Sequence, residues 1–265
     1  MNDQHHRLIG NRMRCTSGWR RPTSPSPHPL MAATGSLPGV VSIPNELRAT
    51  VRDQSTIGRC TGEAIVEVVE GVALRDGVQV DLSANAVYWW ERRLDGSPAS
   101  SDTGSTIATG VTVAQTFGVP TLQTWSDDRD FTLEPDTNAV LDASKRKAQL
   151  VFALPNVAAI KASIRDGFSV ALGFSCPDDL FDPTTLDSGN VNFYDDDSHY
   201  KGDGHAVSIV AVDDSRVIGN CTGALLFNAH WGTSVGLDGL FWLPYSYLLS
   251  GRASDAHTIR LLSSI

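Results

Sequence analysis

The sequence contains no long hydrophobic run. No stretch of the chain approaches the roughly 18 consecutive apolar residues that a membrane-spanning helix needs. The first residues also lack the apolar segment of a secretory signal peptide. We therefore expect a soluble protein in the cytoplasm, with no membrane partner.

Cysteine is scarce, and its spacing argues against two common uses. The chain has four cysteines, Cys15, Cys60, Cys176 and Cys221, and no two of them form a C-x-x-C pair. This spacing disfavours a zinc site, and so few cysteines in a chain of this length do not make a disulfide framework. We expect no metal and no organic cofactor. A cysteine without a catalytic role is expected to be a buried, inert thiol.

Clustered basic residues are missing as well. The net charge is -9 over 265 residues, whereas nucleic-acid binding requires grouped Lys and Arg side chains. We therefore expect no nucleic-acid partner. The charge is unevenly spread, because residues 1–39 carry five arginines and one aspartate, a net charge of +4, which leaves -13 for the rest.

The first 39 residues are expected to form an arm. The run at 22–29 (PTSPSPHP) is incompatible with a helix or a central strand. A basic arm beside an acidic body either docks on that body or remains a solvated tail, and both readings stay open. We divide the chain into this Pro- and Ser-rich arm, residues 1–39, and one domain over residues 40–265.

Two kinds of pattern follow each other along the domain. The first half indicates helices, which begin at Cys60, after Ser83 and near Ser105, and a further helix covers residues 156–166. Helices first and strands later predict an α+β architecture with two segregated lobes. The strand patterns cover residues 168–174, 206–212, 223–228 and 240–243.

Cys60 stands at the predicted start of a helix, after Gly58. The positive end of a helix dipole lowers the pKa of a thiol placed there. Thiol catalysis also requires a histidine base, a group that orients the imidazole, and donors for the developing oxyanion. Because a cysteine at a helix start more often serves packing, the neighbouring motifs decide its role.

Three motifs occur in a characteristic order. The segment 53–60 (DQSTIGRC) places a glutamine six residues before the cysteine, and the segment 202–212 (GDGHAVSIVAV) places a histidine before an apolar strand. The segment 224–245 (ALLFNAHWGTSVGLDGLFWLPY) combines an asparagine, a tryptophan and paired glycines. Together they resemble the papain family of cysteine peptidases, in its bacterial, short-armed form, over residues 37–262.

The resemblance implies both a fold and a set of site residues. The fold is papain-like, with a helical N-terminal lobe, an antiparallel β-barrel-like C-terminal lobe and a cleft between them. Cys60 is the implied nucleophile, His205 its general base and acid, and Gln54 forms the oxyanion hole with the Cys60 N–H. Gly104 lies where the glycines of the family line the cleft and bind the substrate backbone.

The third triad position departs from the family pattern. Aligning Trp231 and Gly232 without a gap puts Ala229 where the family has its orienting asparagine. A bulge that turns Asn228 inward restores the triad, and Asn228 is our predicted orienting residue. Two alternatives are a dyad without a third residue and substitution by His230 or an acidic residue.

Further departures are smaller. Ile57 stands where secreted relatives carry a disulfide-linked cysteine, which fits a reducing compartment. Arg59 is expected to be a solvated surface charge, although a guanidinium at the cleft would favour a thiolate. Glu63 is assigned no role. The three aspartates at 195–197 indicate a solvated acidic loop rather than a calcium site.

The predicted function is that of a cysteine-type endopeptidase acting on a peptide or protein substrate through a Cys60 acyl-enzyme. One alternative is another cysteine-dependent acyl transferase or amidase. Another is a catalytically impaired homologue that binds peptides. The segment 16–21 (TSGWRR) resembles the arm of related bacterial enzymes in outline, so we expect residues 1–39 to act as a regulatory or propeptide-like segment that docks on the domain.

Overall fold

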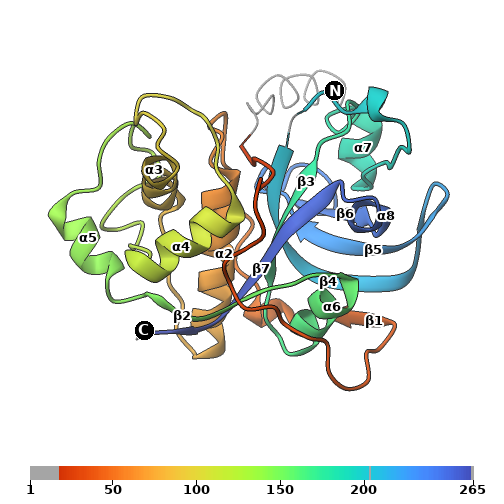
Figure 1. Ribbon diagram of the computed structural model, residues 1–265, viewed down its shortest axis with the longest axis horizontal. Coiled ribbons are helices and arrows are strands. Elements are labelled where there is room, and N and C mark those ends of the chain that lie inside the picture. Colours follow the sequence, from red (N-terminus) through yellow and green to blue (C-terminus); the bar gives the residue numbers. More distant parts are fainter. Residues whose placement is uncertain (1–17, 203, 264–265) are drawn as a thin grey trace.

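A computed structural model describes residues 18–202 and 204–263 of the chain. Figure 1 shows two lobes side by side, with helices α3, α4 and α5 in one and most of the strands in the other. Helix α2 lies near their boundary, and the described part of the arm, coloured red, runs between the lobes. The predicted segregation of helices and strands is confirmed.

The helical lobe follows the sequence pattern at its starts and caps. Helix α2 begins at Cys60, as predicted. The side chain of Ser83 accepts a hydrogen bond from the backbone N–H of Ala86, so the predicted N-cap of α3 is confirmed. The helices of this lobe are α2 (Cys60–Arg75), α3 (Ala84–Leu94), α4 (Ile107–Thr116) and α5 (Thr137–Ala143).

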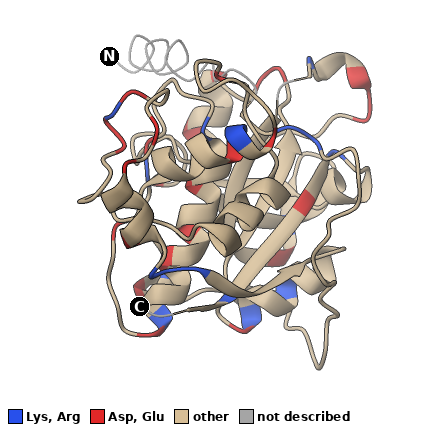
Figure 2. Ribbon diagram, turned by 60° about the vertical axis from the view of Figure 1, so that its left-hand side comes forward, with Lys and Arg blue, Asp and Glu red and all other residues tan. Residues whose placement is uncertain are grey.

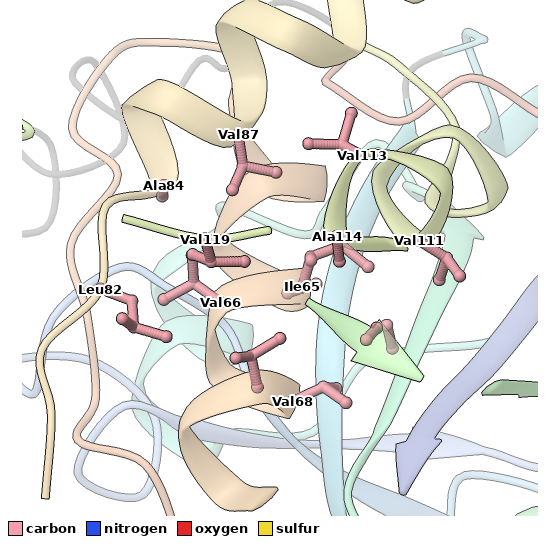
Figure 3. Close-up of a cluster of buried hydrophobic side chains, with 14 of the residues drawn as sticks. Ile65, Val66, Val68, Leu82, Ala84, Val87, Val111, Val113, Ala114 and Val119 are labelled. Carbon is pink, nitrogen blue, oxygen red and sulfur yellow. The ribbon is translucent and has the colours of Figure 1, made fainter. Parts of the chain in front are cut away.

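Apolar side chains of α2 form the centre of this lobe. Figure 3 shows Ile65 and Val66 of α2 near Val87 of α3 and near Val111 and Ala114 of α4. All five are almost completely buried. Burying one branched aliphatic side chain contributes about 1.5–3 kcal/mol, so this packing fixes α2 firmly between its neighbours.

The other lobe is built on one antiparallel sheet of seven strands. Hydrogen bonds join the strands in the order β2-β7-β3-β4-β5-β6, and β1 pairs with β4. The path does not return to its first strand, so among the described strands the sheet is open and "barrel-like" describes it only loosely. The strands are β1 (Val40–Ser42), β2 (Ala148–Ala153), β3 (Val170–Ser175), β4 (Gly204–Ile218), β5 (Cys221–Asn228), β6 (Leu240–Pro244) and β7 (Ala253–Leu262).

Short helices complete the lobe. They are η1 (Asn45–Leu47), α6 (Val157–Arg165), α7 (Pro183–Ser188), η2 (Asp197–His199) and α8 (Ser246–Leu249). Within the described residues, no helix is long and apolar enough to cross a membrane. Figure 2 shows Lys and Arg positions interspersed with Asp and Glu positions over the visible ribbon.

A buried ion network joins α2 to the loops around it. Arg52 is its centre, because its guanidinium contacts Glu63 at 2.5 Å, Glu70 at 3.2 Å and Asp127 at 2.8 Å. It also donates to the carbonyl oxygen of Leu82 at 2.9 Å. Glu63 and Glu70 lie on α2, so one cation neutralises two carboxylates that the helix carries into the interior.

Arg59 belongs to the same network, and its expected surface position is wrong. Its side chain is 6% exposed and contacts Glu63 at 2.7 Å. Arg59 also donates to the carbonyl oxygen of Asp127 at 3.0 Å. Burial opposes the charge of Glu63, but Arg52 and Arg59 outweigh that effect, so the pKa of Glu63 lies below its usual value.

We expect Arg52→Ala to lower the free energy of unfolding by about 3–5 kcal/mol, because it leaves buried carboxylates without their counter-ion. Urea unfolding followed by circular dichroism measures this loss. Lys145→Ala is the matched control, since the ion pair of Lys145 with Asp142 is exposed at the lysine and long at 3.4 Å. Equal losses in the two variants would contradict a structural role for the network.

Candidate active site

Cys60 is the first residue of α2 and is 1% exposed. It therefore lies at the positive end of a 16-residue helix, where free backbone N–H groups favour negative charge. The backbone N–H of Ala206 donates to Cys60 Sγ at 3.3 Å. Because Ala206 follows His205 on β4, this contact brings the two predicted reacting residues together from different lobes.

His205 is held on three sides. Its Nε2 lies 2.9 Å from the carbonyl oxygen of Ala229. The ring stacks on Trp231, with 4.8 Å between ring centroids and 17° between the planes, and it meets the edge of Phe174 at 6.0 Å. Since a carbonyl only accepts hydrogen bonds, Nε2 carries the proton and Nδ1 is left to take one.

Burial keeps the His205 imidazole neutral. Loss of solvent, and secondly the charge of nearby His230, lower the pKa of His205 to about 3, although the bond to Ala229 acts in the opposite direction. The centroids of the two histidine rings are 6.1 Å apart. A neutral ring with a free Nδ1 is the form that acts as a base.

The Asn228 side chain, which we predicted to orient His205, hydrogen-bonds other groups. The Asn228 amide nitrogen donates to Glu67 at 2.6 Å, and its oxygen accepts from the backbone N–H of His230 at 3.2 Å. Both polar ends therefore point away from His205. A bulge is present, because His230 has a left-handed backbone with φ 59°, but it presents the carbonyl of Ala229 to His205 rather than the Asn228 side chain.

Gln54 is fully buried in the turn before Cys60. Its side-chain nitrogen donates to the carbonyl oxygen of Ile57 at 3.2 Å, which orients the amide within that turn. Its backbone N–H donates to His230 at 2.9 Å. The segment that carries Gln54 is therefore bonded directly to the segment whose Ala229 carbonyl contacts His205.

Gly104 lies on the opposite wall and is buried, with φ 63°. Its N–H donates to the hydroxyl of Tyr88 at 2.9 Å. The next residue makes the backbone contacts expected of a cleft wall: Ser105 donates to Gly18 at 2.9 Å and accepts from Arg20 at 2.7 Å. These bonds pair the wall with the arm as a parallel bridge centred on Trp19.

Gly18 covers the predicted nucleophile. A Cβ atom at this position would lie 2.5 Å from Cys60 Sγ and 2.8 Å from the carbonyl oxygen of Gly58. Any side chain would therefore collide with the sulfur or with the turn before it. The arm backbone thus passes directly over Cys60, and the residues before Gly18, including Cys15, lie outside the described residues.

Trp19 fills the neighbouring space and is 4% exposed. Its ring lies on Gly173 and Gly204, where an added Cβ would overlap ring or backbone atoms of Trp19. Its backbone N–H donates to Gly204 at 3.2 Å, and its indole N–H reaches Asp255 at 3.4 Å. Two glycines on adjacent strands therefore make a flat pocket for one large aromatic side chain.

The arm continues along the sheet lobe. The hydroxyl of Ser26 lies 2.7 Å from His257 Nε2, and Leu30 forms a parallel bridge with Ala153 of β2. Burial first, and His28 to a smaller degree, lower the pKa of His257 to about 4. The described arm therefore contacts both the active-site region and a buried histidine of β7.

A small cavity lies beside His205. A cavity of about 110 Å³ is lined by His205, Trp231, Phe181 and Cys176, among others. Within residues 18–202 and 204–263, no group of three or more His, Cys, Asp or Glu side chains could hold a metal ion.

The sequence did not reveal the contact of the Ala229 carbonyl, the pairing by Ser105 or the contact of Glu67 with Asn228. A backbone carbonyl leaves no mark in residue identities, and neither does a pairing through main-chain atoms. Glu67 could have been found, because it stands four residues after Glu63 on a helix that is otherwise mostly apolar, where a carboxylate needs an interior partner.

Known proteins share this fold. A peptidase C1-like protein of Acanthamoeba polyphaga mimivirus is 26% identical over 229 residues, which cover 82% of this chain and 70% of that protein. Xylellain, a cysteine protease from Xylella fastidiosa, has a TM-score of 0.81 at 22% identity, covering 96% of this chain and 98% of xylellain. Procathepsin B S9 from Trypanosoma congolense has a TM-score of 0.72 at 17% identity, covering 98% and 88%. No protein-family model matches the chain.

The predicted family resemblance is confirmed: the chain has the fold of the papain-like cysteine peptidases. The mimivirus match and the structural neighbours together support a cysteine-type peptidase. The roles of individual residues in this chain rest on its own geometry.

The burial of His257 makes the stability of the protein depend on pH. Its pKa is lower folded than unfolded, so between pH 6.5 and about 4 the unfolded chain binds the additional proton and folding stability falls as the pH falls. We expect wild type to lose about 1.4 kcal/mol per pH unit more than His257→Gln in this window. Urea unfolding at pH 7, 6 and 5 measures the difference. If the free energies of unfolding of the two proteins changed equally with pH, the lowered pKa of His257 would be contradicted.

Proposed function

We propose that the chain is a cysteine-type peptidase that hydrolyses peptide bonds through an acyl-enzyme on Cys60, with His205 as its base and acid. The observation that carries the proposal is the contact of Cys60 Sγ with the Ala206 N–H, next to a neutral His205 whose Nε2 is engaged by Ala229. This arrangement leaves Nδ1 as the nitrogen that accepts the thiol proton.

The reaction follows from these groups. Nδ1 of His205 takes the thiol proton, and the thiolate attacks the peptide carbonyl to form a C–S bond and an oxyanion. The Gln54 amide and the Cys60 N–H stabilise the oxyanion. When it collapses, the C–N bond breaks and His205 gives its proton to the leaving amine. His205 then takes a proton from water, and the water oxygen attacks the thioester. The C–S bond breaks, the carboxylic acid leaves, and His205 returns its proton to the Cys60 sulfur.

We expect Cys60→Ala to abolish hydrolysis of a fluorescent casein substrate, while Cys221→Ala retains the wild-type rate. Iodoacetamide labelling of a Trp19→Ala variant at mildly acidic pH, mapped by mass spectrometry, gives a second readout, because the docked arm covers Cys60 in the wild type. Selective labelling of Cys60 over Cys15, Cys176 and Cys221 is expected, because the helix N-terminus favours its thiolate.

Hydrolysis that persists in Cys60→Ala contradicts the proposal. Uniform slow labelling with peptide binding but no turnover favours the catalytically impaired homologue instead. Transfer of the acyl group to an added amine in preference to water favours the acyl transferase.

We also propose that the N-terminal arm covers the active site and restrains the enzyme. Gly18 over the sulfur and Trp19 in the adjacent pocket support this role, since both occupy space that a substrate needs. The pocket formed by Gly173 and Gly204 also supports a preference for peptides with a bulky aromatic side chain beside the scissile bond, which would replace the Trp19 ring.

Trp19→Ala in the intact chain should raise the rate on a small fluorogenic peptide, because it weakens docking of the arm. The expected gain is about tenfold for each 1.4 kcal/mol of docking that is lost. The control is Leu30→Ala, on the same arm, whose side chain is 68% exposed. An unchanged rate in Trp19→Ala would mean that the arm does not restrain the enzyme.

A further inference from the structure

Glu67 is a buried acid that the proposed reaction does not use. It lies on α2, two turns after Cys60, and is 2% exposed. A carboxylate in such a place is costly unless the interior supplies hydrogen-bonding partners. Burial first raises the pKa of Glu67, and His230 acts against that effect.

Its partners lie on both sides of the residue that contacts His205. The Asn228 amide donates to Glu67 Oε1 at 2.6 Å, and His230 Nε2 lies 3.1 Å from Glu67 Oε2. Ala229 stands between the two partners, and its carbonyl oxygen accepts from His205 at 2.9 Å. One carboxylate therefore accepts a hydrogen bond from one flank and lies within ion-pair distance of the other flank of a three-residue segment, whose middle carbonyl contacts the proposed base.

This segment needs an external anchor. His230 has φ 59°, a left-handed conformation that costs a residue other than glycine about 1–3 kcal/mol and persists only where surrounding contacts enforce it. The Asn228 oxygen accepts from the His230 N–H at 3.2 Å, which closes the bulge. Glu67 contacts both residues and so stabilises the turned backbone.

We propose that Glu67 is a positioning residue, which holds His205 in place through Asn228, Ala229 and His230. This inference rests on the proposed function, because it assigns Glu67 to the placement of the proposed base. Helix α2 then positions both reacting residues: Cys60 directly, at its first residue, and His205 indirectly, from two turns further on.

Among the described residues, few charged groups lie near Glu67, the 228–230 segment and His205. His230 faces both Glu67 and His205, and Arg52 and Glu63 act on Glu67 from the ion network. Asp178 and Lys201 line the cavity on the other side of His205 and pair with each other at 2.9 Å. Glu67→Gln keeps an acceptor for Asn228 and a group that reaches His230, while it removes the carboxylate charge.

The chain offers a matched control on the same helix. Glu70 lies three residues after Glu67, is also buried, and contacts Arg52 and the N–H of Leu82 rather than the 228–230 segment. Its loss destabilises the protein through the ion network and leaves the contact of His205 with Ala229 in place.

The first test is steady-state kinetics on a fluorogenic peptide with the intact chain. We expect Glu67→Ala to lower kcat by about tenfold to a hundredfold, since misplacing a reacting group by about 1 Å has effects of this size. KM should change little, because Glu67 and Asn228 line a different cavity from the one beside His205. Glu67→Gln should recover most of the rate, and Glu70→Ala should keep a wild-type kcat per folded molecule.

The second test does not depend on turnover. Nuclear magnetic resonance of the intact chain should show a slowly exchanging His205 Nε2–H in wild type, Glu67→Gln and Glu70→Ala, and its loss in Glu67→Ala. Should Glu67→Ala not fold, Asn228→Ala removes one of the two anchors and should give the same loss of protection. An inactive wild type that shows this pattern would refute the peptidase but not the positioning role.

Two results would overturn the inference. One is a Glu67→Ala protein that keeps both its kcat and the protected His205 Nε2–H. The other is an equal fall of kcat in Glu67→Ala and Glu70→Ala, because that shows a general effect of losing a buried charge on α2.

Discussion

The burial of acids along α2 is the constraint on which the rest of the structure depends. The helix must be buried to bring Cys60 to the lobe boundary, yet it carries Glu63, Glu67 and Glu70 into the interior. Each carboxylate is satisfied by groups outside the helix: Arg52 from the loop before it, and the 228–230 segment from the end of β5. The contacts that satisfy these charges also fix the two lobes around the site.

Much of the fold was predictable because its signals are local. The start of α2 at Cys60, the cap at Ser83 and the central strands carry patterns of hydrophobicity and capping in a few consecutive residues. Strand β7 (Ala253–Leu262) and β2 were missed, since their pairing joins segments about a hundred residues apart and neither shows a clear alternation. The open edge of the sheet is likewise a property of the whole topology.

The site was predictable as far as side chains define it. Cys60, His205 and Gln54 stand in motifs whose spacing is preserved, and the structure brings all three to the lobe boundary. The extra residue between Asn228 and Trp231 left the third triad position open, because the sequence does not show which group a bulge turns towards His205. The direction is set by Glu67, which attracts the Asn228 amide to the far side of the segment. Arg59 was misjudged for a similar reason: its partner, Glu63, is visible only once the helix is built.

The hydrogen bond from His205 to Ala229 is encoded by the shape of the main chain rather than by the chemical identity of a residue. Alanine scanning therefore does not detect this bond, and a comparison of aligned sequences shows only that the orienting side chain of the family is missing at this position. Substitutions at position 229 are limited by the space around the side chain, since Ala229 is fully buried. Such a contact can be probed by replacing a backbone amide with an ester. This replacement weakens a single carbonyl acceptor without altering any side chain.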